Sequence, residues 1–367
     1  MAITAAQVKQ LRDVTGAGMM DCKKALTECN GDMDAAVEFL RKKGQAKAEK
    51  KANRIAAEGI CYIAQDGDTK AAVVEVNSET DFVAQNEKFR TYVAKVAQQA
   101  LNTAAEDIDA FMGEAWAEDT AKTVKDSLVD MIAVISEKLS IRRFKKIEET
   151  EGCVVTYLHG QGRIGVIVDA QTAVVNDEIK TALTNVAMQI AAMNPSYVKK
   201  EEISAETLSK EKEIVVDSSL ADPASLPKPI LNAVIQEALD KNLWGADDKA
   251  AYEAEKNNKF WYNFMSNEGM QVLRDIAASH KAETIENKIF AGLVEGRFSK
   301  RLKEICLVDQ LYVKAEDKED VAQYIAKVAK ENGCTFNVNR FVRFETGEGL
   351  EKRNEDFAAE VAKQMGQ

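Results

Sequence analysis

Apolar residues recur at every third or fourth position between residues 4 and 40, which is the spacing of amphipathic helices. Glycine-containing breaks at residues 15–18 and 30–31 divide this stretch into three parts. Asp32 stands directly before the third part, where its carboxylate can cap the first turn of a helix. The sequence therefore predicts a bundle of three short helices, over residues 4–14, over residues 20–29 and from residue 33 onward.

Two stretches further along share one order of elements, namely two strands followed by a helix. In the first they are predicted over residues 59–64, 71–76 and 86–101, and in the second over residues 152–158, 166–168 and 176–193. Residues 74–80 align with residues 166–172, so the chain contains two related strand–strand–helix units, which suggests a duplication. Between the units, residues 121–139 are predicted to form a helix.

Two charged helices are predicted in the second half of the chain, over residues 204–219 and 282–303, and they enclose residues 220–281. That segment holds three of the four prolines, and a helix is expected to start at Pro229. Its aromatic run at residues 260–264 could contact a partner. The favoured interpretation is a small core for this helical insertion.

The chain is predicted to close with a strand, a helix, a strand and a last helix, over residues 304–313, 317–332, 334–344 and 354–365. A glycine-containing break at residues 346–349 separates the last helix from the strand before it. The apolar residues of this helix form one stripe that suits docking on another surface: Phe357, Ala358, Val361 and Met365.

Phe82 lies in the turn between a predicted strand and the helix that starts at residue 86. An aromatic side chain there is either an exposed knob held by rigid elements or a plug for the chain's own core. Asp81 and Phe82 align with Ala173 and Val174 in the second unit. A charged and aromatic pair in one unit alone indicates a specialised contact with a partner.

The composition is that of a helix-rich globular protein of 367 residues, with 46% hydrophobic and 30% charged residues. A formal net charge of -11 argues against general binding of nucleic acid, which needs a surplus of Lys and Arg. The basic segment 41–54 is interpreted as a solvated helical linker. We find no secretion signal and no apolar stretch long enough for a bilayer, so we expect a cytoplasmic protein without membrane contacts.

Six cysteines lack the spacing of a metal site, and we interpret them as free, mostly buried thiols. The two histidines, His159 and His280, have no nucleophile motif around them, and phosphate-binding glycine loops are absent from the sequence. We therefore expect no enzyme, no cofactor and no metal. A thiol-dependent enzyme stays a remote alternative.

Several motifs resemble those of the elongation factor Ts family, the bacterial and organellar nucleotide-exchange factors for elongation factor Tu. Residues 11–26 resemble the first signature of the family, and Thr80-Asp81-Phe82-Val83 is similar to its second. Further matches occur in order along about four-fifths of the chain, at residues 140–143, 157–160, 163–166, 294–297, 343–345 and 347–349.

The resemblance implies an α+β fold with five parts. A ubiquitin-associated-like three-helix domain with a linker covers residues 1–54. The core has two related α+β subdomains with antiparallel sheets, at residues 55–148 and 149–346. A helical hairpin protrudes from the second at about residues 201–303, with the insertion at about 220–281. A C-terminal helical module covers residues 347–367.

The resemblance also implies a function as a guanine nucleotide exchange factor in translation elongation. The partner is elongation factor Tu, in its GDP-bound and nucleotide-free forms, and Phe82 inserts near the partner's Mg²⁺ site while Asp81 contacts the adjoining helix. The implied Mg²⁺-displacing residues are Thr80, Asp81, Phe82 and Val83. The implied partner-binding residues are Met19, Met20, Lys23, Ile135, Ser136, His159, Arg163, Phe357 and Val361.

Two departures from the family pattern affect these expectations. Ser136 stands where Gly is usual, and residues 220–281 exceed the usual hairpin. Self-association stays open, as a homodimer or as a dimer of heterodimers. The alternative function is a ubiquitin-associated-like adaptor that binds another partner without exchange activity.

Overall fold

The computed structural model describes residues 3–352, and the chain forms two compact units. The first unit contains residues 3–194, 312–314 and 322–352, and the second contains residues 195–311 and 315–321. The helix predicted over residues 354–365 lies outside the described residues. Among the described helices, none is both long and apolar enough to cross a membrane.

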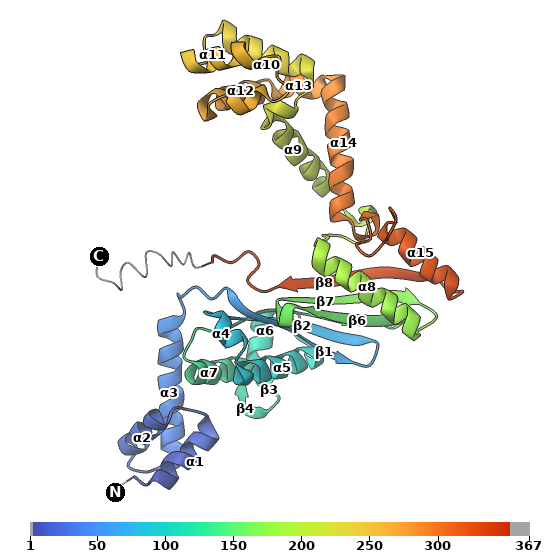
Figure 1. The fold of residues 1–367 in the computed structure, drawn as a ribbon. Coiled ribbons are helices and arrows are strands. Elements are labelled where there is room, and N and C mark those ends of the chain that lie inside the picture. Colours follow the sequence, from blue (N-terminus) through green and yellow to red (C-terminus); the bar gives the residue numbers. More distant parts are fainter. Residues whose placement is uncertain (1–2, 353–367) are drawn as a thin grey trace. The chain divides into compact units, whose positions relative to one another are not determined.

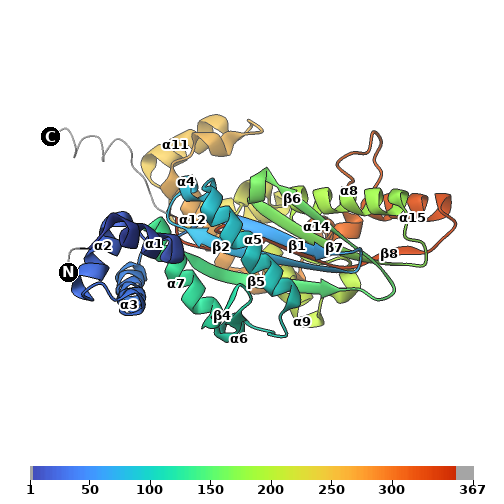
Figure 2. The same cartoon turned by 90° about the horizontal axis from the view of Figure 1, so that it is seen from below.

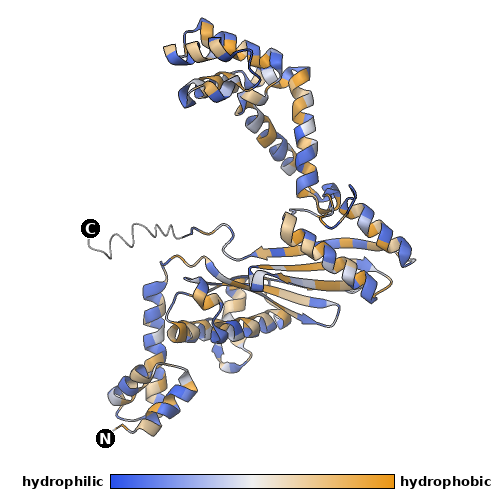
Figure 3. Ribbon diagram, viewed as in Figure 1, coloured by the Kyte–Doolittle hydropathy of each residue, from blue (hydrophilic) through white to orange (hydrophobic). Residues whose placement is uncertain are grey.

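The three predicted N-terminal helices are confirmed, as α1 (Ala5–Thr15), α2 (Met19–Glu28) and α3 (Met33–Lys51) (Figure 1). Asp32 caps α3 by accepting a hydrogen bond from the amide of Ala35 at 2.9 Å. The basic segment continues α3 as one helix as far as Lys51, and its hydrophilic character is visible in Figure 3.

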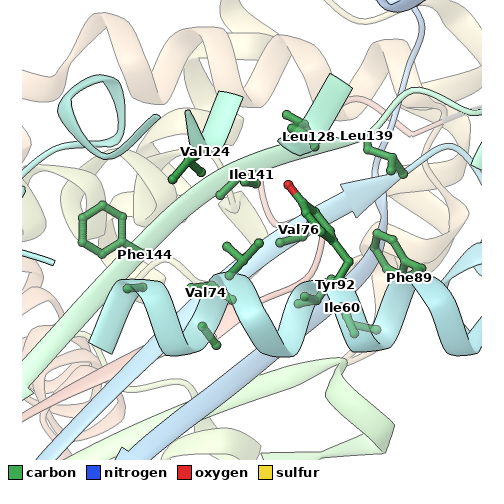
Figure 4. Packing of buried hydrophobic residues seen from close by; sticks show 14 of the residues in the cluster. Ile60, Val74, Val76, Phe89, Tyr92, Val124, Leu128, Leu139, Ile141 and Phe144 are labelled. Atoms are coloured by element: carbon green, nitrogen blue, oxygen red, sulfur yellow. The ribbon is translucent and has the colours of Figure 1, made fainter. Parts of the chain in front are cut away.

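The first sheet has the antiparallel order β1-β2-β5, from β1 (Glu58–Asp66), β2 (Lys70–Ser78) and β5 (Ser140–Glu148). Helix α5 (Glu87–Asn102) crosses one face of it, as Figure 2 shows. Figure 4 shows Phe89 and Tyr92 of α5 packed with Val76 of β2 and with side chains from β5 and α7 (Val124–Ile135). Helix α6 (Ile108–Gly113) adds buried Phe111 to this core.

The helix predicted over residues 121–139 is shorter at both ends. Residues 115–123 form a hairpin instead, from β3 (Ala115–Trp116) and β4 (Asp119–Thr123). Thr123 then starts α7, because its hydroxyl and the Asp126 carboxylate form a reciprocal capping box. Ser136 ends α7 in a left-handed conformation, with φ of 66°.

The second sheet has the antiparallel order β6-β7-β8, from β6 (Gly152–His159), β7 (Ile164–Thr172) and β8 (Phe336–Glu345). Helices α8 (Asp177–Met193) and α15 (Val321–Glu331) follow β7 and precede β8 in the chain, and α8 packs on this sheet. Cys61 of the first sheet lies in one apolar cluster with Ile167 and Phe344 of the second. Burial there raises the pKa of the Cys61 thiol to about 12.

The two strand–strand–helix units have the same order of elements, but their structural alignment is shifted by two residues from the predicted one. Both central strands carry a buried acid next to a bulge in the pairing with the third strand, Glu75 in β2 and Asp169 in β7. Glycines mark the same register, because a side chain at Gly59 or at Gly152 would collide with a carbonyl of the central strand. Glu75 therefore corresponds to Asp169, and not to Ile167.

This shift changes the comparison of Phe82 with Val174. The connection from strand to helix has eight residues in the first unit, 79–86, and four in the second, 173–176. Both connections end on an Asn that caps the following helix, Asn86 and Asn176. The extra residues form a short helix, α4 (Asp81–Ala84), so Phe82 has no structural counterpart in the second unit.

The second compact unit is helical. Its helices are α9 (Ala205–Leu220), α10 (Lys228–Asp240), α11 (Ala246–Glu255), α12 (Asn267–Ser279), α13 (Lys281–Glu286) and α14 (Lys288–Ile305). The predicted helix 282–303 is split at Asn287, which caps α14. The strand predicted over residues 304–313 is wrong, because α14 continues to Ile305 and a 3₁₀ turn, η5 (Leu307–Asp309), follows.

The aromatic residues of the insertion form a core, as the favoured interpretation predicted. Tyr252 packs between Trp244 and Trp261, with ring centroids 5.3 Å apart in both pairs. Both tryptophans are buried in one cluster with α9 and α14, while Phe260 and Phe264 are about half exposed. The insertion and the hairpin helices therefore share their apolar interior.

The buried Asp169 predicts a pH dependence of stability. Burial and a hydrogen bond with Glu149 raise the pKa of Asp169 from 3.8 to about 6, against the effect of Arg340. The folded chain therefore holds this proton more tightly than the unfolded chain does. The stabilisation that the protonated Asp169 carboxyl contributes is complete below about pH 4 and is lost as the pH rises through about 6.

We expect Asp169→Asn, which cannot ionise, to keep its stability as the pH rises. The free energy of unfolding of the variant minus that of the wild type should therefore increase between pH 4 and pH 7. Urea unfolding at several pH values measures this difference. Asp21→Asn is the control with the opposite sign, because hydrogen bonds from Lys43 and Lys47 lower the pKa of Asp21 from 3.8. The stabilisation by Asp21 is lost as the pH falls below about 4, so Asp21→Asn should differ from the wild type by a nearly constant amount between about pH 5 and 7. A difference for Asp169→Asn that does not change with pH contradicts the prediction.

Candidate functional site

Phe82 is an exposed aromatic knob, as the sequence predicted. Its side chain is 83% exposed, although it lies between two well-packed elements, β2 and α5. The next two residues, Val83 and Ala84, are buried in the core of the first sheet. Helix α4 therefore anchors itself through Val83 and presents the phenyl ring of Phe82 to the outside.

The segment that carries Phe82 leaves the sheet beside the segment that follows α7. Strands β2 and β5 pair Asn77 with Ser140, so residues after 77 and residues before 140 emerge from neighbouring strand ends. Two carboxylates link these segments. Glu137 accepts hydrogen bonds from the amides of Glu79 (3.1 Å) and Thr80 (3.0 Å) and from the Thr80 hydroxyl (2.7 Å).

Glu79 makes a second connection, from the segment with Phe82 to the segment after α7. Its carboxylate accepts a hydrogen bond from the amide of Lys138 at 2.6 Å and from the guanidinium of Arg54 at 3.2 Å. The ammonium of Lys138 in turn donates to the carbonyl of Arg54 at 2.7 Å. The chain after α3, the turn with Phe82 and the end of α7 are thus fastened to one another.

Ile135 and Ser136 lie in this junction, directly before Glu137. Ile135 is half-buried and Ser136 is exposed. The left-handed conformation at position 136 explains why glycine is usual there, because glycine adopts it without steric cost. Ser136 adopts the same conformation with φ of 66°. Serine therefore keeps the same turn and adds a hydroxyl at its surface.

The predicted residues of the second sheet lie at the end of β6 and on the loop that leads to β7. His159 is exposed, and its Nδ1 lies 2.9 Å from the hydroxyl of Tyr157. Arg163 is exposed at the end of the same loop. Arg90 of α5 joins this loop to the Phe82 turn, because its guanidinium donates to the carbonyls of Ala84 and Gln161, both at 3.1 Å.

The predicted site residues of the N-terminal helices lie in the first half of α2. Met19 is 59% exposed and Met20 is 75% exposed, and Lys23 is exposed one turn later. The three-helix part packs on α7, since Gly16 lies against Val134 and Gly44 lies against Val129 and Ala133. A cleft of about 530 Å³ separates the end of α1 from α5 and α7.

The structure thus connects most of the predicted residues through α7 and Arg90. The helices packed on α7 carry Met19, Met20 and Lys23. The C-terminal end of α7 carries Ile135 and Ser136, and Glu137 links it to the segment with residues 80–83. The connection from β6 to β7, to which Arg90 donates a hydrogen bond, carries His159 and Arg163. Phe357 and Val361 lie outside the described residues.

Sequence reasoning missed Glu79, Arg90 and Glu137, which hold the turn in place. Glu79 and Glu137 adjoin predicted site residues, but their partners are 57 to 59 positions away in the chain. No local periodicity reports such a pairing.

The site has exposed apolar and charged groups and no arrangement typical of covalent chemistry. Cys61, Cys153 and Cys306 are buried, and burial raises the pKa of each thiol. Within residues 3–352, no three His, Cys, Asp or Glu side chains converge as metal ligands would. The arrangement suits recognition of another protein.

Known proteins are similar in sequence over nearly the whole length of this chain. The family model described as elongation factor TS matches residues 79–348. The elongation factor Ts of Clostridium tetani is 41% identical over 365 residues, and that of Clostridioides difficile is 42% identical over 364 residues. Each comparison covers 99% of both chains. The chain therefore belongs to the elongation factor Ts family, whose members act in translation elongation.

Proposed function

We propose that this protein is a guanine nucleotide exchange factor that binds elongation factor Tu with GDP, promotes the release of Mg²⁺ and GDP, and leaves when GTP rebinds. The observation that carries the proposal is Phe82, which is 83% exposed on a turn fastened to α7. An aromatic side chain in this setting can enter a pocket of a partner without rearrangement of its own fold.

Such an exchange needs no covalent step by this chain. A GTPase retains its nucleotide through its phosphate loop and Mg²⁺. A factor that binds the nucleotide-free form more tightly must weaken nucleotide binding by the same factor, because the two equilibria are linked. In this proposal Phe82 enters the partner near its Mg²⁺ site, Asp81 contacts the adjoining helix, and Thr80 and Val83 hold the turn.

The remaining predicted residues extend the contact. Met19, Met20 and Lys23 form an exposed, adaptable surface on α2, because methionine side chains are flexible and polarisable. Ile135 and Ser136 lie next to the Phe82 turn, and His159 and Arg163 provide a second surface on the loop between β6 and β7. We expect the exchange to take place in the cytoplasm, where translation proceeds.

Phe82→Ala should slow stimulated GDP release by roughly 30- to 1000-fold, because truncation of an aromatic anchor costs about 2–4 kcal/mol. The thermal midpoint should change little, since the ring is exposed. Release of labelled GDP from elongation factor Tu, with and without the variant, measures the effect. Normal exchange by Phe82→Ala would remove the central support of the proposal.

Two controls sharpen this comparison. Phe264→Ala removes a half-exposed phenyl ring from the second compact unit, which is helical, and should leave exchange within about 2-fold of wild type. Val174→Ala truncates a half-buried side chain in the shorter connection and should reduce stability by about 1 kcal/mol or less, with exchange retained.

Asp81→Ala should slow exchange less than Phe82→Ala, since a rim charge contributes less than a central anchor.

Replacement of residues 221–280 by a short Gly/Ser turn should leave GDP release within a few-fold of wild type. The two ends of this segment are neighbours, because the ammonium of Lys281 lies 2.6 Å from the carboxylate of Asp217. Ion pairs of Arg301 with Glu211 and of Lys212 with Glu295 still join α9 to α14. Circular dichroism checks that the helices persist, and a 100-fold loss with intact helices would assign the insertion to the partner contact.

Truncation after Gly349 should weaken the complex and leave the rate at saturating factor nearly unchanged. The apolar residues Phe357 and Val361 follow the break after β8 and are far in sequence from Phe82. Titration of the truncated chain against a fixed amount of GDP-loaded elongation factor Tu separates the half-saturating concentration from the maximal rate. A collapse of the maximal rate would make this segment part of the exchange machinery.

A further inference from the structure

The turn that carries Phe82 has only a few hydrogen bonds of its own, from the Ser78 hydroxyl to the Thr80 carbonyl and from the amides of residues 85 and 86. Helix α4 has only four residues, and a helix of that length is unstable in isolation. Thr80 occupies the N-cap position, but its hydroxyl makes no capping hydrogen bond. It donates to Glu137 instead, at 2.7 Å. The order of the turn therefore depends on groups outside it.

Glu137 supplies the fastening at the N-terminal end of α4. One carboxylate oxygen accepts the amides of Glu79 and Thr80, and the other accepts the Thr80 hydroxyl. Three donors on one acceptor group fix both the position and the orientation of the backbone that precedes Phe82. Arg90 holds the other end through the carbonyl of Ala84.

We propose that Glu137 is a positioning residue for exchange: it presets the Phe82 turn in the free protein, so that the ring meets the partner already oriented. This inference rests on the proposed function. A flexible turn would have to be ordered on binding, and the free energy of that ordering would be subtracted from the interaction. Glu137 acts through Phe82 and needs no contact with the partner.

The first test measures the turn in the free protein and does not depend on exchange activity. In Glu137→Ala, amide hydrogen exchange of residues 79–85 should be at least about 10-fold faster than in wild type. Glu114→Ala is the matched control, because Glu114 is another half-buried carboxylate that accepts a threonine hydroxyl, that of Thr103. Unchanged hydrogen exchange at residues 79–85 in Glu137→Ala overturns the proposal.

The second test is a double-mutant cycle on stimulated GDP release. Glu137→Ala should slow release on the order of 10-fold in the wild-type background and less than about 2-fold in the Phe82→Ala background. Equal slowing in both backgrounds overturns the proposal, since a merely structural loss would not depend on the ring at position 82. If Glu137→Ala does not fold, Glu137→Gln keeps the shape and one acceptor, and the same inequality is expected.

The two proposals fail in different ways. If wild-type protein does not accelerate GDP release, the proposed function is wrong, while the hydrogen-exchange result still decides whether Glu137 orders the turn. If wild type accelerates release and Phe82→Ala does so more slowly, but Glu137→Ala slows release equally in both backgrounds, only the positioning role of Glu137 is wrong.

Discussion

The buried carboxylate of Glu75 sets the strongest physical constraint on how the strands of the first sheet, β1-β2-β5, pair with one another. It lies in the central strand β2 with no exposed surface, and an unpaired charge there would cost several kcal/mol. Arg142 and Arg143 of β5 provide ion pairs at 3.0 and 2.5 Å, and the amide of Gly347 adds a hydrogen bond at 2.8 Å. The two ion pairs come from the neighbouring strand and the amide comes from the turn after β8, so the full set of partners forms only when both sheets are in place.

The same arrangement places the candidate site. Strands β2 and β5 must pair in one register for Arg142 and Arg143 to reach Glu75, and that register brings Asn77 opposite Ser140. The residues beyond these two positions carry Phe82 on one side and Ser136 on the other. Two motifs that are far apart in the sequence, residues 140–143 and 343–349, thus contribute to the scaffold, and the exposed groups lie at its edge.

Local patterns could predict the elements and the exposure of Phe82, because periodicity, caps and glycine breaks act within a few residues. They could not reveal the connection between distant segments, such as Thr80 with Glu137. The shift by two residues between the repeated units arose because apolar runs align in more than one way, whereas the buried acids and their bulges determine the register. The hairpin before α7 was missed because Ala, Lys and Asp are compatible with helix, and the capping box at Thr123 decided otherwise.

The longer connection in the first unit has a mechanical consequence. Any force on the ring of Phe82 passes first into α4, which is bound at its start by Glu137 and at its end by Arg90. Through Glu137 the load reaches the end of α7, and through Arg90 it reaches α5 and the loop at Gln161 beside the second sheet. A turn attached only by its backbone would bend under such a load. This turn passes the load to the end of α7, to α5 and to the loop beside the second sheet.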